Sequence, residues 1–585
     1  MAGARPFHTM KFRWMTAPEQ PVLVDFLTRE LKVSPLLAQC LLNRGMSEPG
    51  PIREFLDPKL RNLADPFLLP NLRAAVTRLL EARSRGEGVV IFGDYDVDGV
   101  TATTLLYETL TRLGWKVDCY LPHRMEEGYG LTQSAVENCL AKYPAPLLLA
   151  VDCGSTAVES IAWLQGRGVD VIVLDHHQVS TPPPAALALV NPHLAPADGS
   201  APAFRELCSA GLAFKLAHAV VKQAREENLP GALEVDLKGT LDLVALGTIA
   251  DLVPLTGENR ILVTAGLERI NRTRRAGLLA LMQVAGIERR VQGYEVGFQL
   301  APRLNAAGRL ETATAALDLL LAPDLPTALP LAQSLDTCNR ERQTIERGIV
   351  DQVLGSLRTR FDPGEDFVII EGDLLWHIGV VGIVASRICH EFYRPSIVLG
   401  GDGHEWRGSG RSIEGFDLAA ALRECSDLLV RHGGHAMAAG LSLQPSRVNE
   451  LRERLNQIAR RTLTPEQLQP RLRLDAEVRV RDLTRDRIEE LGRLQQTGMG
   501  NPAVQLWCRG CMHHRPLQRI GADRKHAKLW ITQPGAQPVE AIWWGAGDLP
   551  LPVGTFDLAF APKLNEYNGT THVQLNVLDW RPTVS

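Results

Sequence analysis

The feature of the sequence that most constrains its fold is an alternation of short apolar runs and amphipathic stretches between about residues 76 and 270. Apolar runs such as Val89–Phe92 and Leu147–Val151 alternate with stretches that have helical spacing, such as Thr101–Trp115. Strands that are apolar at every position belong to parallel sheets covered by helices on both faces. The sequence therefore predicts a parallel α/β domain here.

Three of the apolar runs end in polar side chains. Aspartates and histidines follow the three runs in the order Asp94, Asp96 and Asp98, then Asp152, then Asp175, His176 and His177. Asp251 follows a further apolar stretch that has helical spacing. The carboxyl ends of parallel strands lie at one edge of a sheet, where ligands bind. We therefore expect these acids and histidines to converge.

Such a cluster of carboxylates repels itself and raises its own pKa values unless a cation is bound. Oxygen-rich ligation with one or two imidazoles suits Mn²⁺ or Mg²⁺ better than a metal that prefers thiolates. The ligands suffice for two ions that share a carboxylate, an arrangement that serves phosphoryl transfer. A single aspartate after a strand is more often a helix N-cap, and Asp94 alone is compatible with that interpretation. Three such strand ends favour metal binding.

The motifs GDYDVDG, VDCG, LDHH and IAD, in this order, resemble those of the DHH phosphoesterase superfamily. Further along, QLAPRLNAAGRLETA, WHIGVVGIVASRI, GSGRSIEGFDL and HGGHAMAAGLSL resemble the RecJ family of bacterial single-strand-specific exonucleases. Ile378 stands where members of this family usually have Pro. The resemblance covers nearly the whole chain.

The resemblance implies roles for the residues at the sheet edge. Asp96 and Asp152 would hold one metal ion. The second ion would be held by Asp98, Asp152, His176 and Asp251, with Asp152 as the bridge. Asp94 would be a further ligand or would orient one. His177 would contact the scissile phosphate or position a ligand, although a histidine satisfied within the core is the alternative.

A second group of residues is expected to bind substrate. Glycines such as Gly433 and Gly434 in HGGHAMAAG let the backbone approach a phosphate, and His435 offers a donor. Arg411 and Ser412 offer a guanidinium fork and a hydroxyl, which suit a terminal phosphate. Family resemblance adds Arg303 and Arg309, although a single arginine is usually a surface residue.

From about residue 465 the pattern changes to short alternating runs, which predict a small β-barrel. Its aromatic residues could stack on bases while nearby cations follow the backbone of a single strand. The aromatic residues are Trp530, Trp543, Trp544 and Tyr567, and the cations are Arg524, Lys525, Lys528 and Lys563. Some of these rings are expected in the barrel core, since only one ring of a Trp-Trp pair on a strand faces outward.

The stretch CRGCMHH, residues 508–514, has the Cys-x-x-Cys spacing of half a zinc site. No further cysteine follows to complete it, and on a regular strand Cys508 and Cys511 would point to opposite faces. A zinc site is therefore not expected there.

The composition narrows the functional class. A net charge of −4 argues against a general cationic coat but is compatible with a local basic groove. The ten cysteines show no disulfide pattern, as expected of a cytoplasmic protein. No run of about 18 apolar residues suggests a membrane span. Translation could begin at Met1 or at Met10, and the sequence does not distinguish them.

We expect five parts in a mixed α/β protein. They are an N-terminal helical segment (1–75), a parallel-sheet DHH domain (76–270), a linker with a long connecting helix (271–364), a smaller α/β DHH-associated domain (365–460) and an OB-fold barrel (461–585). The long helix is expected over residues 331–358. The stretch TPPPAALALVNPHL is expected to be a loop.

By resemblance, the expected function is 5′→3′ exonuclease action on single-stranded DNA, releasing mononucleotides with two Mn²⁺ or Mg²⁺ ions. The partners would be a single strand with a 5′ end, a single-strand-binding protein and a helicase, in recombination and repair. One alternative is a small-molecule phosphatase or a nuclease for short oligonucleotides, against which the barrel argues. The other is a non-catalytic scaffold that binds single strands, which would be expected to lack metal ligands.

Overall fold

A computed structural model of the chain describes residues 12–124, 126–194, 202, 204–310, 312–401, 404–547, 549–567 and 569–583. Met10 and the side chain of Tyr567 lie outside the described part. The chain forms two compact units. Unit 1 contains the chain up to Ile52, Arg342–Arg493 and the chain from Ala503, and unit 2 contains Arg53–Glu341 and Leu494–Pro502.

Unit 2 is built on a parallel five-stranded sheet, as predicted. Its order is β3 (Lys116–Tyr120), β2 (Gly88–Gly93), β4 (Leu147–Val151), β5 (Asp170–Leu174) and β6 (Ala188–Val190). The strand β6 lies in the stretch expected to be a loop, so that prediction was wrong. A three-residue strand at the sheet edge is too short to leave a pattern.

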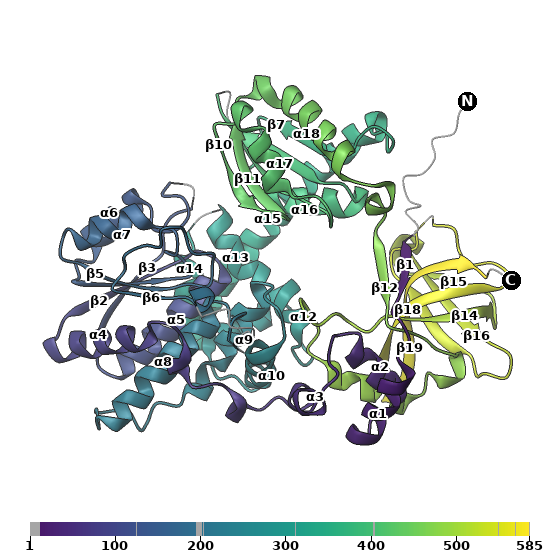
Figure 1. The fold of residues 1–585 in the computed structure, drawn as a ribbon, viewed down its shortest axis with the longest axis horizontal. Coiled ribbons are helices and arrows are strands. Elements are labelled where there is room, and N and C mark those ends of the chain that lie inside the picture. Colours follow the sequence, from purple (N-terminus) through teal and green to yellow (C-terminus); the bar gives the residue numbers. More distant parts are fainter. Residues whose placement is uncertain are drawn as a thin grey trace. The chain divides into compact units, whose positions relative to one another are not determined.

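Helices cover both faces of this sheet (Figure 1). One face packs against α6 (Gln133–Lys142) and α7 (Val158–Gln165). The other packs against α4 (Leu72–Arg85), α5 (Val97–Arg112), α8 (Ser209–Glu226) and α9 (Leu241–Ala250). Two covered faces explain the continuous apolar runs of β2, β4 and β5, whereas the edge strand β3 carries Lys116 and Asp118.

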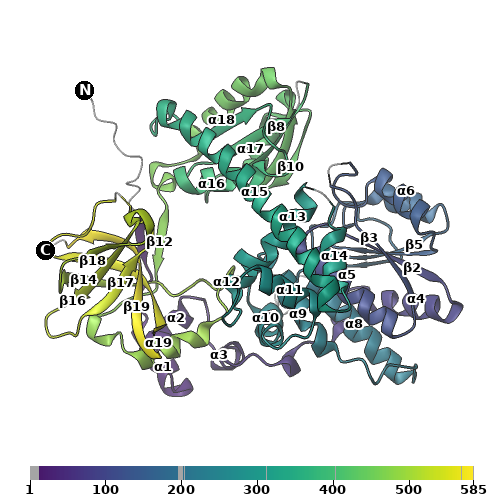
Figure 2. The same cartoon turned by 180° about the vertical axis from the view of Figure 1, so that it is seen from behind.

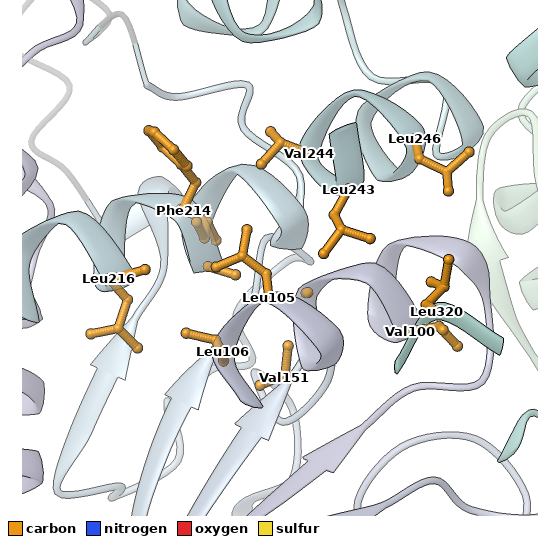
Figure 3. Close-up of a cluster of buried hydrophobic side chains, with 14 of the residues drawn as sticks. Val100, Leu105, Leu106, Val151, Phe214, Leu216, Leu243, Val244, Leu246 and Leu320 are labelled. Carbon is orange, nitrogen blue, oxygen red and sulfur yellow. The ribbon is translucent and has the colours of Figure 1, made fainter. Parts of the chain in front are cut away.

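The core between α5, α8 and α9 sets the position of the chain segments that carry the candidate site. Leu105, Phe214 and Leu243, one from each helix, point into a common cluster (Figure 3). Each fully buried side chain of this kind contributes roughly 1.5–3 kcal/mol to the free energy of unfolding. The packing fixes the N-termini of α5 and α8 and the C-terminus of α9, which all bear site residues.

The remaining helices of unit 2 follow α9 in the chain. They are α10 (Gly257–Ile270), α11 (Ala276–Val284), α12 (Gly293–Glu295), the π-helix η5 (Val296–Leu300), α13 (Ala301–Leu310) and α14 (Thr314–Leu321). Short 3-10 turns lie at η1 (Leu60–Asn62), η2 (Pro66–Leu68), η3 (Pro192–Leu194) and η4 (Leu237–Thr240). The predicted long connecting helix is present as α15 (Leu325–Arg360), which begins in unit 2 and ends in unit 1.

Unit 1 contains a second, mixed sheet, and the helices α16, α17 and α18 lie beside this sheet (Figure 2). Its order is β10 (Arg431–His435), β11 (Ala438–Leu443), β9 (Trp406–Arg411), β8 (Ser396–Gly401) and β7 (Ile369–Asp373). The helices are α16 (Val381–Phe392), α17 (Leu418–Glu424) and α18 (Val448–Thr462), with 3-10 turns η6 (Ser426–Leu428), η7 (Pro445–Arg447) and η8 (Pro465–Leu468).

The predicted barrel forms a second part of unit 1. Its strands are β13 (Ala476–Glu477), β14 (Leu506–His513), β18 (Phe556–Tyr567), β19 (Thr570–Pro582), β17 (Val539–Trp543), β16 (His526–Thr532) and β15 (Gln518–Ile520), in spatial order. A pairing between β14 and β16 closes it. The helical elements are η9 (Val480–Asp482), α19 (Arg485–Leu491), η10 (Gly492–Leu494) and η11 (Ala522–Arg524).

The N-terminal segment joins unit 1 through a strand. In a two-stranded parallel sheet, β1 (Arg13–Thr16) pairs with β12 (Arg471–Leu474). The helices α1 (Pro21–Leu31), α2 (Pro35–Leu42) and α3 (Pro49–Leu56) follow β1. Among the described residues, no helix is both long and apolar enough to cross a membrane.

Candidate functional site

The loop between β2 and α5 brings three aspartates to the carboxyl edge of the parallel sheet. Asp96 is the N-cap of α5, because its Oδ1 accepts hydrogen bonds from the backbone N–H groups of Asp98 (2.9 Å) and Gly99 (3.2 Å). A Cβ on Gly99 would lie 2.6 Å from the carbonyl oxygen of Asp94, so only glycine permits this tight loop. Asp94 and Asp98 are buried beside it.

The N-terminus of α8 fixes two of the carboxylates. Asp98 accepts hydrogen bonds from the backbone N–H groups of Ser209 (2.7 Å) and Ala210 (2.8 Å). The Ser209 hydroxyl donates to Oδ1 of Asp152 at 2.8 Å. Asp152 has a φ of 64°, a left-handed conformation that aspartate and asparagine tolerate better than most residues. A strand end and a helix start thus place both carboxylates together.

His176 completes the cluster. Its Nε2 atom lies 3.5 Å from a carboxylate oxygen of Asp152, 3.5 Å from one of Asp251 and 3.8 Å from one of Asp98. Burial lowers the pKa of His176 to about 4, which leaves the ring neutral and able to act as a ligand.

Three ligand groups, each with atoms within 4.8 Å of one another, lie at this edge in the part of the chain that the structure describes. They are Asp94 with Asp96 and Asp152, Asp98 with His176 and Asp251, and Asp152 with His176 and His177. Asp152 and His176 each take part in two of them. The bridging role of Asp152 stays a prediction.

The electrostatics of the cluster indicate that a cation is needed. Burial and mutual repulsion raise the pKa of Asp98 to about 6 and that of Asp251 to about 9. The same causes raise the pKa values of Asp94 and Asp152 well above their usual range. Two buried atoms, Oδ1 of Asp94 and Nε2 of His176, have no hydrogen-bond partner. A divalent cation would satisfy both atoms and relieve the repulsion, so the donor set fits Mn²⁺ or Mg²⁺.

His177 differs from His176 in its surroundings. Burial alone would lower its pKa, but a 2.7 Å hydrogen bond with Asp175 and the charge of that carboxylate raise the pKa to about 9. Asp175 is itself held by the backbone N–H of Ser155 at 2.9 Å. The hydroxyl of Tyr129 lies 3.4 Å from the His177 ring. His177 is therefore a fixed cation at neutral pH beside the carboxylates.

The two predicted linker arginines lie on α13 in unit 2. Arg303 donates to Oδ1 of Asp336 at 2.9 Å and to the carbonyl of Gln299 at 2.6 Å. Arg309 lies close enough to Tyr95 to act on its pKa. Asn305 of the same helix accepts a 3.1 Å hydrogen bond from the backbone N–H of Val97. Helix α13 therefore abuts the loop that carries the aspartates.

The second sheet holds the next group of predicted residues. The cross-strand register places His435, Ala438 and Arg411 in one row and Gly433, Gly440 and Ser409 two rows along, on the same face of the sheet. Arg411 donates to the Ser409 hydroxyl at 2.9 Å. The buried Ser412 hydroxyl donates instead to the carbonyl of Phe416 at 2.7 Å. Gly434 follows Gly433 on β10 and has a φ of +136°.

The predicted barrel aromatics are in different environments. Trp530 lies under the Arg515 guanidinium, with 3.3 Å between the guanidinium carbon and the ring centroid. Trp543 is half-buried at the end of β17. Trp544 is 54% exposed, and its ring packs edge-on against His526.

Cys508 and Cys511 both point into the barrel core. A shift of register between them on β14 turns both side chains inward, so the expectation of opposite faces was wrong. A hydrogen bond with Cys511, together with burial, raises the pKa of the Cys508 thiol far above its usual value. The thiolate that zinc requires is therefore disfavoured.

Comparison with known proteins identifies the family. Residues 88–248 match the DHH family N-terminal domain, 365–461 the DHHA1 domain and 474–579 the RecJ OB domain. The single-stranded-DNA-specific exonuclease RecJ of Bacillus subtilis (strain 168) is 37% identical over 575 residues, which cover 97% of this chain and 71% of that protein. The chain belongs to the RecJ family. The RecJ of Escherichia coli (strain K12) is 32% identical over 93% of this chain and 95% of its own length.

Solved structures of the RecJ family agree with the fold. The crystal structure of RecJ in complex with Mn²⁺ from Thermus thermophilus has a TM-score of 0.83 and 32% identity, covering 98% of this chain and 80% of that one. A second RecJ structure from the same organism contains Mg²⁺ and has a TM-score of 0.77 with 31% identity, covering 98% of this chain and 79% of that one. Both metals are those that the donor set of this RecJ-family chain fits.

Several site residues were not singled out by sequence reasoning. Asp175 was noted only as part of its motif, although it orients His177. Ser209 and Asn305 carry no local signature, because they lie far from their partners in the sequence. Tyr129, whose hydroxyl lies 3.4 Å from the His177 ring, is in the loop after β3, where no sequence signal marks it.

Proposed function

We propose that this chain is a metal-dependent 5′→3′ exonuclease that degrades single-stranded DNA to mononucleotides. One observation carries the proposal: a buried carboxylate and histidine cluster at the sheet edge has unpartnered ligand atoms and raised pKa values. The relatives named above as single-stranded-DNA-specific exonucleases support the substrate. The 5′→3′ polarity rests on family resemblance.

Two Mn²⁺ or Mg²⁺ ions would bind this cluster. Asp96 and Asp152, with Asp94 beside them, form one ligand group, and Asp98, His176 and Asp251 form the other. When bound, the ions would supply an activated water nucleophile and neutralise charge on the phosphate. The bridging role falls to Asp152, which the Ser209 hydroxyl holds in place.

The protein's own groups position the reaction. The α8 N–H groups fix Asp98, so the ligand set is formed before substrate arrives. Asp175 binds Nδ1 of His177. The other ring nitrogen, Nε2, lies 3.4 Å from the Tyr129 hydroxyl and would donate to a phosphate oxygen when substrate is bound. In the chain without bound ions the pKa of His177 is about 9, so this donor is a cation there at neutral pH.

Each of the two units carries its own candidate contacts to substrate phosphates. On unit 2, Arg303 and Arg309 of α13 would bind phosphates near the carboxylates. On unit 1, Arg411, His435 and the backbone at Gly433 and Gly434, which lie in three successive cross-strand rows, would form a phosphate-binding patch. The Ser412 hydroxyl is committed to a backbone carbonyl, so Ser409 is the better hydroxyl donor in this patch.

The barrel would hold the more distant part of the strand. Among the three predicted tryptophans, all of them described, Trp544 is the ring most open to a base. Trp530 with Arg515 forms a stacked pair at which a phosphate would bind. Trp543 and Tyr567 complete the proposed contacts. The cellular setting would be cytoplasmic DNA recombination and repair, with a helicase supplying single strands and a single-strand-binding protein covering them.

The test is an end-specific nuclease assay on the full chain. A long 5′-phosphorylated strand labelled at its 3′ end should shorten stepwise in Mn²⁺, with release of mononucleotides, and EDTA should stop the reaction. Blocking the 5′ end should prevent cleavage, and blocking the 3′ end should not. Activity that depends on a free 3′ end would overturn the polarity.

Parallel reactions separate the alternatives. Hydrolysis of pyrophosphate or dinucleotides without degradation of long strands would favour the small-substrate phosphatase or nuclease. Strand binding without any hydrolysis in Mn²⁺ would favour a non-catalytic scaffold.

A further inference from the structure

The helical segment that begins at Gly293 presents two aromatic rings on the surface of unit 2. Tyr294 and Phe298 stack with ring centroids 5.0 Å apart and an interplanar angle of 28°. Their side chains are 57% and 71% exposed. A phenylalanine and a tyrosine paired with each other in solvent leave much apolar area uncovered, which is typical of a binding surface.

The backbone beneath these rings is firmly held. The buried Glu295 carboxylate accepts a 2.9 Å hydrogen bond from the backbone N–H of Gln292 and pairs with Arg289 at 2.7 Å. The next turn is the π-helix η5, a conformation that is frequent at functional sites. Gly297 of η5 packs on Ile249, two residues before the ligand Asp251. The rings are thus displayed by a backbone that needs little ordering on binding.

The same helical segment leads to the metal centre. From η5 it continues as α13, where Asn305 bonds to Val97 and Gly308 packs against the Tyr95 backbone. At about 1.5 Å per residue, Phe298 lies roughly 10 Å along the axis from Asn305. The exposed aromatic pair and the carboxylate cluster therefore sit at two ends of one short helical path.

The charge along this path suits a polyanion. Residues 288–309 contain four arginines (Arg289, Arg290, Arg303 and Arg309) and two glutamates (Glu288 and Glu295), in a chain whose net charge is −4. Arg289 is ion-paired with Glu295 and Arg303 with Asp336. Stacking rings beside cations are the means by which proteins hold single strands without regard to sequence. A protein partner with an apolar surface could bind the two rings but would gain little from the arginines.

We propose that Tyr294 and Phe298 form a stacking platform for a nucleobase in the part of the strand that remains after the cut. This inference rests on the proposed function and adds to it a second strand-binding site, on the nuclease unit itself. The platform would hold the shortened strand near the carboxylates after each nucleotide leaves, independently of the barrel. A dinucleotide would be too short to reach the platform.

The test compares the full-length Tyr294→Ser/Phe298→Ser variant with the wild type in Mn²⁺. Loss of one stacked base should raise KM for a long 5′-phosphorylated strand by roughly 5- to 150-fold. The kcat/KM for a dinucleotide should not change. Tyr294→Phe keeps the ring and should behave as wild type. Leu279→Ser, which alters another exposed apolar residue of unit 2, should also leave KM unchanged.

A fluorescence measurement locates the base. Strands with 2-aminopurine at successive positions should be quenched at one position when bound to an inactive Asp152→Asn chain, and the double substitution should remove that quenching. Unchanged KM and unchanged quenching at every position would overturn the platform. That result, with a wild type that degrades long strands, leaves the proposed function intact. A wild type inactive on long strands contradicts the function itself.

Discussion

Two buried polar clusters in unit 2 are built on opposite principles. At the carboxylate cluster, like charges face one another and two buried ligand atoms lack partners. Around Arg260, donors meet acceptors. This fully buried guanidinium donates to the carbonyls of Phe55 (2.7 Å), Leu494 (3.2 Å) and Gln495 (2.5 Å) and stacks on the Phe55 ring, 3.8 Å from its centroid.

This difference in hydrogen bonding distinguishes a cluster that stabilises the fold from one that binds a ligand. A buried charge whose donors meet acceptors stabilises one arrangement of the chain. A buried group of like charges costs free energy until a ligand of opposite charge arrives. The cluster around Arg260 should therefore govern stability with little direct effect on chemistry, and the carboxylate cluster should do the reverse. Substitutions in each cluster test this division.

The largest effect is expected from Asp152→Asn. Asparagine keeps the left-handed backbone and the acceptor for Ser209 but removes the charge shared by two ligand groups. We expect hydrolysis of a long strand to fall by roughly 10³-fold or more. In EDTA the same substitution should increase the free energy of unfolding, because burial and then repulsion by Asp98 make a carboxylate at this position costly, and a neutral amide avoids that cost.

The measurements are initial rates in Mn²⁺ and denaturant unfolding in EDTA. Asp118→Asn, on β3 of the same sheet, is the matched control and should change neither. Retained hydrolysis in a nuclease-free preparation would exclude the bridging role. Lower stability in EDTA would show that the cluster is not held under repulsion.

Arg260→Met should produce the opposite pattern. It leaves several buried carbonyls without a donor, which should cost about 3 kcal/mol or more of unfolding free energy. Folded protein that remains should cut DNA with kcat close to that of the wild type. Thermal unfolding and single-turnover rates test this, with the exposed Arg272→Met as control. A variant of normal stability and low kcat would reverse the assignment.

The same contacts govern how the barrel should be tested. Residues 494–502 belong to unit 2, where the carbonyls of Leu494, Gln495 and Gln496 meet Arg260. A truncation from about residue 465 would remove these acceptors together with the barrel. Substitutions of exposed barrel residues such as Trp544 are therefore the better probe of strand binding.

The sequence predicted the carboxylate cluster well because its signal is local. Each strand is apolar throughout and each ends in Asp94, Asp152 or Asp175, so sheet geometry alone brings them to one edge. Arg260 could not be predicted in the same way. Its partners lie more than 200 residues away and are backbone carbonyls, which have no sequence signature.

Elsewhere the limits of prediction were also geometric. A shift of register on β14 turned Cys508 and Cys511 to the same side, against the alternation of a regular strand. The strand β6 was too short to recognise. The hydroxyl of Ser412 lies in the expected motif but is directed to Phe416, which only the fold reveals.

Asp175→Asn should have an intermediate effect, because Asp175 acts through His177. The substitution weakens the hold on the imidazole and lowers the pKa of His177 from about 9 toward its ordinary value. We expect kcat to fall by roughly 10- to 100-fold with a smaller change in KM. Asp170→Asn, at the other end of β5, is the control. Equal losses for both variants would indicate general damage to the strand.

The smallest effect is a release of protons when Mn²⁺ binds. Without a cation, the pKa of Asp251 is about 9, above its ordinary value of 3.8, so the folded chain binds a proton that the unfolded chain lacks between these pH values. The stability of the metal-free chain should therefore fall as pH rises through this window. At about pH 7.5 Mn²⁺ should displace this proton. The affinity of the chain for Mn²⁺ should therefore rise with pH. Calorimetry in two buffers of different ionisation enthalpy counts the protons. The Asp251→Asn chain should release about one proton fewer than the wild type. If the wild type released no proton, its carboxylates would already be ionised without the ion. Repulsion would then not distinguish this cluster from the one around Arg260.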